Sequence, residues 1–274
     1  MLRLSVQAVT HSLFSKGHPI VLSPWRLLDT GAENAPYNMA LEKILLTSCI
    51  NGTSPNTLHF LEFSPCVLLG YSQSVEDEVD EEFCFMNGIE INRRISGGGA
   101  IYMDGGVLGW EIIAKKNSSG IPSSLHDMYH KLCGALIAAL LKFGIYSSYK
   151  PLNDVEIDGR KISGTGGTEL DDSFIFHGTV LINFDPETMS KALKAPDKNA
   201  ARNRQRTISM KDLLEYTPSM SEVKKNIACS FAETLNIEFI EGALYPIEVQ
   251  NHARELPKFQ SKGWIYLRQM YDSC

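Results

Sequence analysis

Apolar residues recur at helical spacing along residues 35–50, so that Leu41, Leu45 and Cys49 fall on one side of a helix. We therefore predict an amphipathic helix there, with a buried stripe. Comparable patterns predict four helices toward the end of the sequence, at roughly 186–194, 208–216, 220–235 and 246–257.

The longest helix is predicted over residues 123–145, where apolar positions repeat over several turns. Ser123 or Ser124 can cap its first turn, because a serine hydroxyl accepts a hydrogen bond from a free backbone amide. Gly144 can end it, because glycine adopts the left-handed backbone that follows many helices.

Short apolar or alternating runs bounded by turn residues predict the strands. These strands lie near residues 25–28 and at 56–63, 65–70 and 107–116. A short acidic helix within residues 78–90 leads to the strand that delivers Arg93 and Arg94. Residues 153–167 predict a β-hairpin with a wide loop, and residues 172–184 predict a central strand.

Strands dominate the middle of the chain and helices its end, without a repeat or a low-complexity linker. This grouping predicts an α+β fold with a mixed, largely antiparallel sheet flanked by helices, and argues against a doubly wound βαβ fold. Neither GxGxxG nor GxxxxGK[ST] occurs, so the glycines do not form a Rossmann dinucleotide-binding motif or a P-loop. We expect one principal domain over residues 24–274 and an extension over residues 1–23.

The chain of 274 residues has a net charge of -6, which argues against a nucleic-acid binder that works through bulk positive charge. Its six cysteines show no CxxC spacing, which argues against a zinc site and a disulfide scaffold and fits a reducing cytosol. No run of about 18 apolar residues predicts a membrane span.

The first acidic residue is Asp29, and the preceding stretch carries Arg3, Lys16 and Arg26 among Ser, Leu and Val. This composition has some transit-peptide character, but an extension leading into the first strand is the favoured interpretation. We therefore expect a cytoplasmic protein, with an organellar matrix as the alternative if residues 1–23 are a targeting segment.

A candidate anion site lies where Arg93 and Arg94 precede three consecutive glycines, residues 97–99. Glycines let the backbone approach a ligand and turn its amides toward it. Taken alone, a glycine run is more often a flexible turn.

Three polar side chains stand in strand-like settings later in the chain. Lys161 lies between the turn glycines Gly159 and Gly164, a setting that can hold its ammonium group in place. His177 and Thr179 interrupt an apolar run, and a buried polar group needs a partner or a ligand. A histidine satisfied within the core is the simpler alternative.

Together these segments resemble the lipoate-protein ligase A family, whose superfamily also holds biotin protein ligases and octanoyltransferases. The resemblance spans roughly residues 24–268. It rests on "RRISGGGAIYMD", "NDVEIDGRKISG" and "FHGTVLINF", supported by "NMALEKILL", "LLGYSQ" and "KFQSKGWIYLR".

The resemblance implies an enzyme that activates lipoate with ATP to form lipoyl-AMP. The acyl group would then pass to a lysine of a lipoyl-domain or H-type acceptor protein. Lys161 would contact the acyl carbonyl and the phosphate in both steps. Arg94, and secondarily Arg93, would bind phosphate. Asp154, beside Asn153, would organise Mg²⁺ or the incoming amine.

The resemblance assigns further residues to the ligands. The acyl-adenylate would contact Ser96, Gly97, Gly98, Gly99, Ala100, Ile101, Tyr102 and Asp104, and the acyl substrate would contact Gly70, His177, Gly178 and Thr179. Met103 and Val107 depart from the family's usual histidine and asparagine, so the hydrogen bonding of this loop must differ.

Octanoyltransferases of this fold carry the acyl group on a cysteine, at positions that correspond to Phe174 or Tyr146 here. Neither residue is a thiol, which favours ATP-dependent ligation. Transfer from preformed lipoyl-AMP stays open, as does a non-catalytic acyl-adenylate binding module. The resemblance covers the catalytic domain but not the accessory C-terminal domain of longer ligases. We therefore expect that the protein requires a partner subunit or a dedicated acceptor protein. The choice between lipoate and octanoate also stays open.

Overall fold

The computed structural model describes residues 24–151, 153–194 and 206–267. The helices are α1 (Ala35–Ile50), α2 (Val75–Glu78), α3 (Glu81–Met86), α4 (Leu125–Leu141), α5 (Pro186–Ala192), α7 (Met210–Leu213), α8 (Met220–Leu235), α9 (Pro246–Phe259) and α10 (Lys262–Ile265). The strands are β1 (Trp25–Glu33), β2 (Thr57–Phe63), β3 (Cys66–Leu69), β4 (Glu90–Arg93), β5 (Ile101–Met103), β6 (Val107–Lys115), β7 (Ser148–Lys150), β8 (Asp154–Ile157), β9 (Arg160–Leu170), β10 (Ser173–Leu181) and β11 (Phe239–Gly242).

The strands form two sheets. The main sheet has eight strands in the order β11-β1-β2-β6-β10-β9-β8-β7, and the small sheet has the order β4-β3-β5. β1 runs parallel to β2 and β11, and β3 runs parallel to β4, whereas the other pairs are antiparallel. The predicted α+β fold with a mixed, largely antiparallel sheet is confirmed, and β10 is central as predicted.

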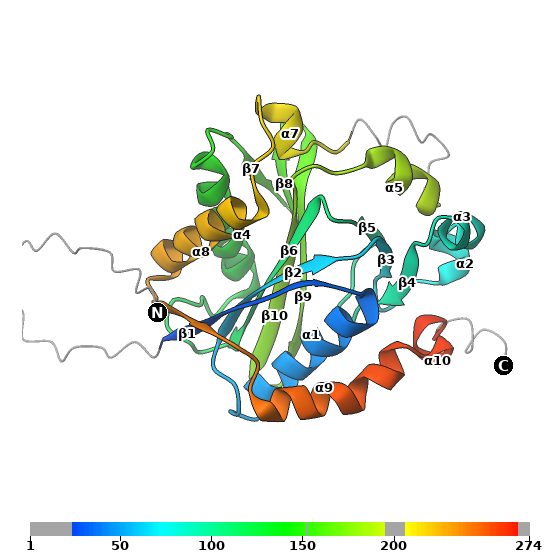
Figure 1. The fold of residues 1–274 in the computed structure, drawn as a ribbon. Coiled ribbons are helices and arrows are strands. Elements are labelled where there is room, and N and C mark those ends of the chain that lie inside the picture. Colours follow the sequence, from blue (N-terminus) through cyan, green and yellow to red (C-terminus); the bar gives the residue numbers. More distant parts are fainter. Residues whose placement is uncertain (1–23, 152, 195–205, 268–274) are drawn as a thin grey trace, which may run out of the picture.

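Helices cover both faces of the main sheet (Figure 1). α4 and α8 pack together on one face and α1 and α9 on the other. The alternation along β6 explains this, because Trp110 and Ile112 join the core under α4 and α8, whereas Ile113 packs with Leu41 and Leu45 of α1. Burying each such side chain contributes about 1.5–3 kcal/mol, so both layers stabilise the sheet.

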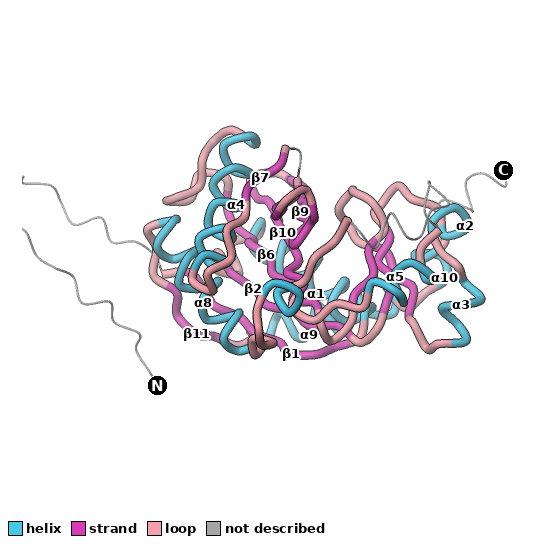
Figure 2. Tube along the Cα trace, turned by 90° about the horizontal axis from the view of Figure 1, so that it is seen from above, coloured by secondary structure: helices cyan, strands magenta, loops and turns pink. Residues whose placement is uncertain are grey.

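The small sheet lies beside the main sheet, with α2, α3, α5 and α10 around it (Figure 2). Only Ser64 and Pro65 separate β2 from β3, so the two sheets are joined by a short connection. Val67, Leu69 and Tyr102 of the small sheet pack with residues of α2, α3 and α5 in a core of their own. This arrangement places the residues between β4 and β5 at the boundary of the two sheets.

The helix ends follow their capping chemistry. Ser124, rather than Ser123, caps α4, and its hydroxyl accepts a hydrogen bond from the Asp127 amide. Asn34 caps α1 in the same way. α4 ends at Leu141, a turn before the predicted end, and α7 is shorter than the predicted helix at 208–216.

The predicted wide loop in the hairpin of residues 153–167 is wrong. β8 and β9 are joined by the two-residue turn Asp158–Gly159, whose φ angles are 50° and 76°. Two left-handed residues match the twist of a hairpin, and Asp-Gly is a preferred sequence for such a turn. The tight turn fixes the start of β9 and hence the place of Lys161.

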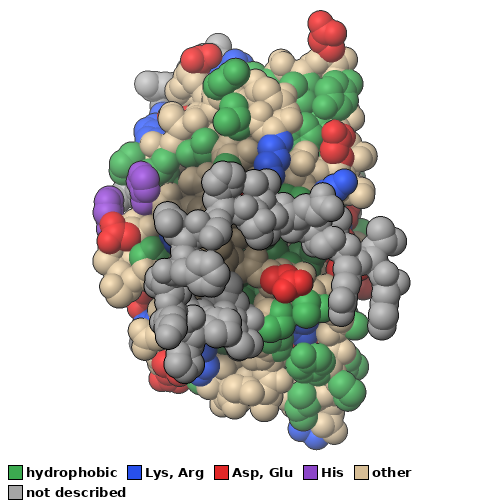
Figure 3. Space-filling model, turned by 90° about the vertical axis from the view of Figure 1, so that its left-hand side faces the viewer, with side chains coloured by type: hydrophobic (Ala, Val, Ile, Leu, Met, Phe, Trp, Pro, Cys, Tyr) green, Lys and Arg blue, Asp and Glu red, His purple; other side chains and the backbone are tan. Residues whose placement is uncertain are grey.

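Acidic and basic side chains are interspersed on the face of the molecule drawn in Figure 3, instead of gathering by sign. Among the described helices, none is long and apolar enough to cross a membrane. The predictions for residues 1–23 lie outside the described residues.

Candidate active site

A cavity of about 270 Å³ lies between α1, the main sheet and the glycine loop, which we define as residues 96–100. Most residues predicted for the site line it: Arg94, Gly97, Gly98, Gly99, Ala100, Ile101, Tyr102, Asn153, Lys161, His177, Gly178 and Thr179. Five predicted residues are not in its lining: Gly70, Arg93, Ser96, Asp104 and Asp154. The structure thus brings together segments that lie far apart in the sequence.

Lys161 is held at the cavity wall by an ion pair. Its Nζ lies 2.8 Å from Oδ1 of Asp154, on the neighbouring strand β8. The side chain occupies the space above Gly164, where a Cβ would come within 2.5 Å of Nζ. Asn153 is fixed beside this pair, because its Nδ2 donates to the Thr165 carbonyl at 2.9 Å. The ammonium group is therefore positioned by the strands around it.

The glycine loop is packed too closely for side chains at one point. A Cβ on Gly70 would lie 2.0 Å from the Gly98 carbonyl oxygen, so the residue that packs against the loop at this point must be glycine. Gly98 itself has a φ of 97°, which also favours glycine. Gly70 therefore shapes the loop from outside the cavity.

Arg94 holds the loop from within. Its Nη1 donates to the Leu68 carbonyl at 2.8 Å, and its Nη2 donates to the Gly97 and Gly99 carbonyls at 3.1 and 3.0 Å. Burial lowers the pKa of Arg94 to about 10, although the nearby Glu42 opposes this shift. The guanidinium remains charged at neutral pH and lies where it can act on an anion in the cavity.

Arg93 lies outside the cavity, in contrast to the expected contact with phosphate. Its side chain is fully buried, and its guanidinium donates to carbonyl oxygens of Gly70, Tyr71 and Gln73 on one side. It also donates to the carbonyl of Ile265, at 2.7 Å. Arg93 thus joins the turn after β3 to the C-terminal helix α10, since successive side chains on a strand point to opposite faces.

His177 reaches the glycine loop through a hydrogen bond between its Nε2 and the Ser96 hydroxyl, at 3.1 Å. Burial, reinforced by the charge of Arg94, lowers the pKa of His177 to about 3. The imidazole is therefore neutral at physiological pH. Ser96 positions His177 instead of lining the cavity.

Three other predicted residues have local contacts. The Asp104 carboxylate accepts a hydrogen bond from the Gly106 amide at 2.8 Å, so it shapes the turn between β5 and β6. Thr179 accepts from the Gly164 amide at 3.3 Å. Gly178 lies against the Trp110 ring, which a Cβ would approach within 2.4 Å.

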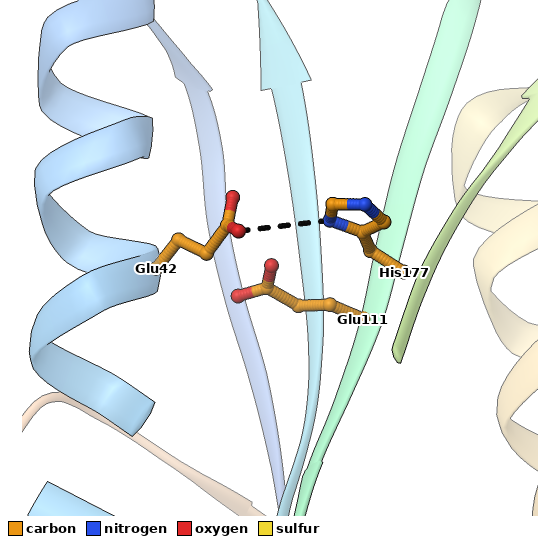
Figure 4. Close-up of side chains that lie close together, drawn as sticks. All are labelled: Glu42, Glu111 and His177. Atoms are coloured by element: carbon orange, nitrogen blue, oxygen red, sulfur yellow. Dashed lines mark ion pairs between the residues drawn. The ribbon is translucent and has the colours of Figure 1, made fainter. Parts of the chain in front are cut away.

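Two buried carboxyl groups in the cavity wall, Glu42 and Glu111, were not expected from the sequence. Each residue is 1% exposed, and the two carboxyl groups lie close to each other and to His177 (Figure 4). Burial raises the pKa of each, and their mutual repulsion adds to the shift of Glu42. The sequence contains a sign of them, because Glu111 is the one acidic residue of the apolar strand β6 and Glu42 is the one acidic residue of the apolar helix α1.

The cysteines of the described segments are all outside the cavity lining. Cys133 lies 3.9 Å from the Thr165 hydroxyl, but it is buried and its pKa is raised to about 11, mainly by desolvation. A thiol in this state is a poor nucleophile. Phe174 is in the core and Tyr146 is exposed, so neither candidate cysteine position faces the cavity.

Comparison with known proteins relates this chain to one family. Residues 34–232 match the model of the lipoyl protein ligase A/B catalytic domain. Octanoyltransferase LipM of Kyrpidia tusciae is 26% identical, covering 89% of this chain and 99% of the relative. Lipoate-protein ligase A subunit 1 of Thermoplasma acidophilum is 30% identical, covering 87% of this chain and 94% of the relative.

Solved structures show the same fold. A bipartite lipoate protein ligase from Thermoplasma acidophilum, studied with its E2 lipoyl domain, superposes with a TM-score of 0.81 at 26% identity, covering 89% of this chain and 96% of that one. A lipoate-protein ligase A bound with ATP also gives 0.81, at 25% identity, covering 89% and 99%. This chain belongs to the lipoyl protein ligase A/B catalytic-domain family.

Proposed function

We propose that the protein is an ATP-dependent lipoate-protein ligase. It activates lipoate, or octanoate, as the acyl-adenylate and transfers the acyl group to a lysine of a lipoyl-domain or H-type acceptor. The observation that carries this proposal is the Lys161–Asp154 pair at the wall of a cavity that also contains the glycine loop.

Activation joins two anions, since a carboxylate oxygen must attack the α-phosphorus of ATP while pyrophosphate leaves. An ammonium about 4 Å from each charge contributes on the order of 4 kcal/mol at an effective dielectric of about 20. Lys161 is placed for this because Asp154 and the strands fix its Nζ. Arg94 adds a second positive charge behind the glycine loop.

Transfer uses the same groups. The acceptor lysine amine attacks the acyl carbonyl, the bond to AMP breaks, and AMP leaves with the electron pair. Lys161 stabilises the oxygen charge that develops in this step. Asp154 pairs with Lys161 and would orient the amine.

Mg²⁺ would accompany ATP in this reaction and neutralise phosphate charge. Mg²⁺ is commonly held by one or two carboxylates together with substrate phosphates. Asp154 fits that pattern, because its carboxylate lies next to Asn153 in the sequence and pairs with Lys161, both of which line the cavity. Arg94 and the backbone of residues 97–100 would contact the phosphates.

The relatives support this proposal and its closest alternative. A ligase subunit and an ATP-bound ligase are among them, but so is an octanoyltransferase, and transfer without adenylation would use the same residues. The absence of a thiol from the cavity lining, among the described residues, favours ligation. The bipartite relative supports an accessory subunit as a partner.

The test is to mix the protein with ATP, Mg²⁺, lipoate and a lipoyl domain and to measure the mass of the acceptor. A mass gain equal to one lipoyl group is expected. A gain from supplied lipoyl-AMP, but none from lipoate and ATP, would instead identify a transferase. The assay is repeated with a separate accessory domain from a bipartite ligase. No gain in any mixture would support a non-catalytic binding module.

A further inference from the structure

Glu42, Glu111 and His177 form a buried cluster whose arrangement the acyl chemistry leaves unexplained. One ligand atom from each residue lies within 4.8 Å of the other two. The side chains come from α1, β6 and β10 and point toward one another (Figure 4). The register of the sheet enforces this, because Glu111 and His177 are direct cross-strand partners.

The atoms that converge here are acceptors. Oε1 of Glu111 bonds Nδ1 of His59 at 2.8 Å, whereas its Oε2 is buried without a hydrogen-bond partner in the described structure. Oε1 of Glu42 is also buried without a hydrogen-bond partner in the described structure. When His177 donates from Nε2 to Ser96, its Nδ1 presents a lone pair 3.6 Å from that Glu42 oxygen. Three lone pairs therefore face a common centre.

Such a centre is costly unless a positive charge occupies it, because buried carboxylates without partners lose their hydration. Two carboxylate oxygens and one imidazole nitrogen suit a divalent transition metal ion better than Mg²⁺ or Ca²⁺, which prefer oxygen ligands. The outer atoms of the ligands are also held: His59 holds Glu111, and Ser96 holds His177. Outer contacts of this kind orient the residues of metal sites.

We propose that Glu42, Glu111 and His177 bind one divalent first-row transition metal ion, for which Zn²⁺ and Mn²⁺ are the probes. Arg94 is the nearby positive charge that opposes binding, but it bonds three carbonyl oxygens, and its charge also favours the ionised form of Glu42. All three ligands line the cavity, so a further coordination position faces it. The site is separate from the Lys161–Asp154 pair and does not rest on the proposed function.

The test measures metal binding without any acyl substrate. The full chain is stripped with a chelator, dialysed, and titrated with Zn²⁺ and with Mn²⁺ by calorimetry, with metal content measured by mass spectrometry. We expect one ion per chain, a rise in melting temperature on binding, and an anomalous scattering peak between the three side chains in crystals. Glu111→Gln should lose stoichiometric binding and the rise in melting temperature.

Glu169→Gln is the matched control, because Glu169 is an exposed residue of β9 that pairs with Lys116, and its metal binding should equal that of the wild type. Metal-free Glu111→Gln should melt no lower than the metal-free wild type, since glutamine keeps an oxygen that can bond His59 and removes a buried ionisable group with one oxygen lacking a partner. A wild type that binds neither ion overturns the proposal. Equal binding by wild type and Glu111→Gln, or a peak elsewhere, also overturns it.

Discussion

Lys161 is the residue whose position matters most for the proposed chemistry. Lys161→Ala should reduce both adenylation and transfer by about 10²–10³-fold, the size expected when one electrostatic donor is removed from an active site. Pyrophosphate release and acceptor mass measure the two steps separately. Lys150→Ala is the control, because Lys150 forms a surface ion pair with Glu156 and lies outside the cavity lining. Full turnover by Lys161→Ala would remove the lysine from the mechanism.

Gly70 should tolerate no side chain, because its Cβ would collide with the Gly98 carbonyl oxygen at 2.0 Å. We expect Gly70→Ala to lower the free energy of unfolding by about 1–3 kcal/mol and to weaken nucleotide binding by displacing the glycine loop. Gly134→Ala, in α4, meets no atom within 4 Å and should instead raise stability by about 0.5–1 kcal/mol. Urea unfolding of both variants checks the contrast.

Single residues also show where inference from sequence stops. The motifs pointed to the glycines and Lys161, which line the cavity, and they ranked Arg94 ahead of Arg93 but gave both a contact with phosphate. Adjacent residues face opposite ways, so only the packed structure shows that Arg94 borders the cavity and Arg93 does not. Glu42 and Glu111 were missed because their proximity depends on the packing of α1 against β6.

At the scale of elements, the β8–β9 hairpin positions Lys161, and its turn contains a glycine whose backbone disfavours a side chain. Gly159 has a φ of 76°, which costs a residue with a side chain about 1–2 kcal/mol. Gly159→Ala should therefore destabilise the hairpin by that amount and lower acyl transfer, since Lys161 follows two residues later. Thermal unfolding and acceptor mass measure these effects. Gly105→Ala is the control, at a turn with room for a methyl group.

The elements were predictable to the extent that local sequence determines them. Apolar periods located α1 and α8 closely, and the predicted cap located the start of α4, because Ser124 makes its bond within one turn. The wide loop was an error that the Asp158–Gly159 dipeptide could have prevented. The order of the strands is a property of the assembled sheet, so it could not be obtained from any one segment.

At the scale of the whole molecule, a buried ion pair connects the first strand to a late helix. Arg26 of β1 bonds both carboxylate oxygens of Glu248 in α9 at 2.8 Å, and Ser54 also donates to Glu248. Glu248→Gln should lower the free energy of unfolding at neutral pH by about 3–5 kcal/mol, because Arg26 is left without its counter-charge. Glu255→Gln, at a more exposed pair with Lys43, should cost about 1 kcal/mol or less.

This pair also predicts a dependence on pH. Burial favours the neutral acid, but hydrogen bonds from Arg26, Ser54 and the Tyr245 amide outweigh it, and the Glu248 pKa is lowered. A lowered pKa in the folded state means that the stabilisation is complete above the pKa of the unfolded chain and is lost as pH falls through the folded one. Wild type and Glu248→Gln should therefore converge in stability on acidification below about pH 4. A gap that stays constant with pH would contradict this assignment.

The buried Arg93 side chain has a consequence for dividing the chain. It fastens the turn that supports the glycine loop to backbone oxygens of α10, which lies more than 160 positions later. A chain cut before Ile265 would lose carbonyl oxygens that accept hydrogen bonds from the buried Arg93 guanidinium. The turn after β3, which packs against the glycine loop, would then be held less firmly. A chain divided after α10 should therefore keep the glycine loop in place, whereas one divided before α10 should not.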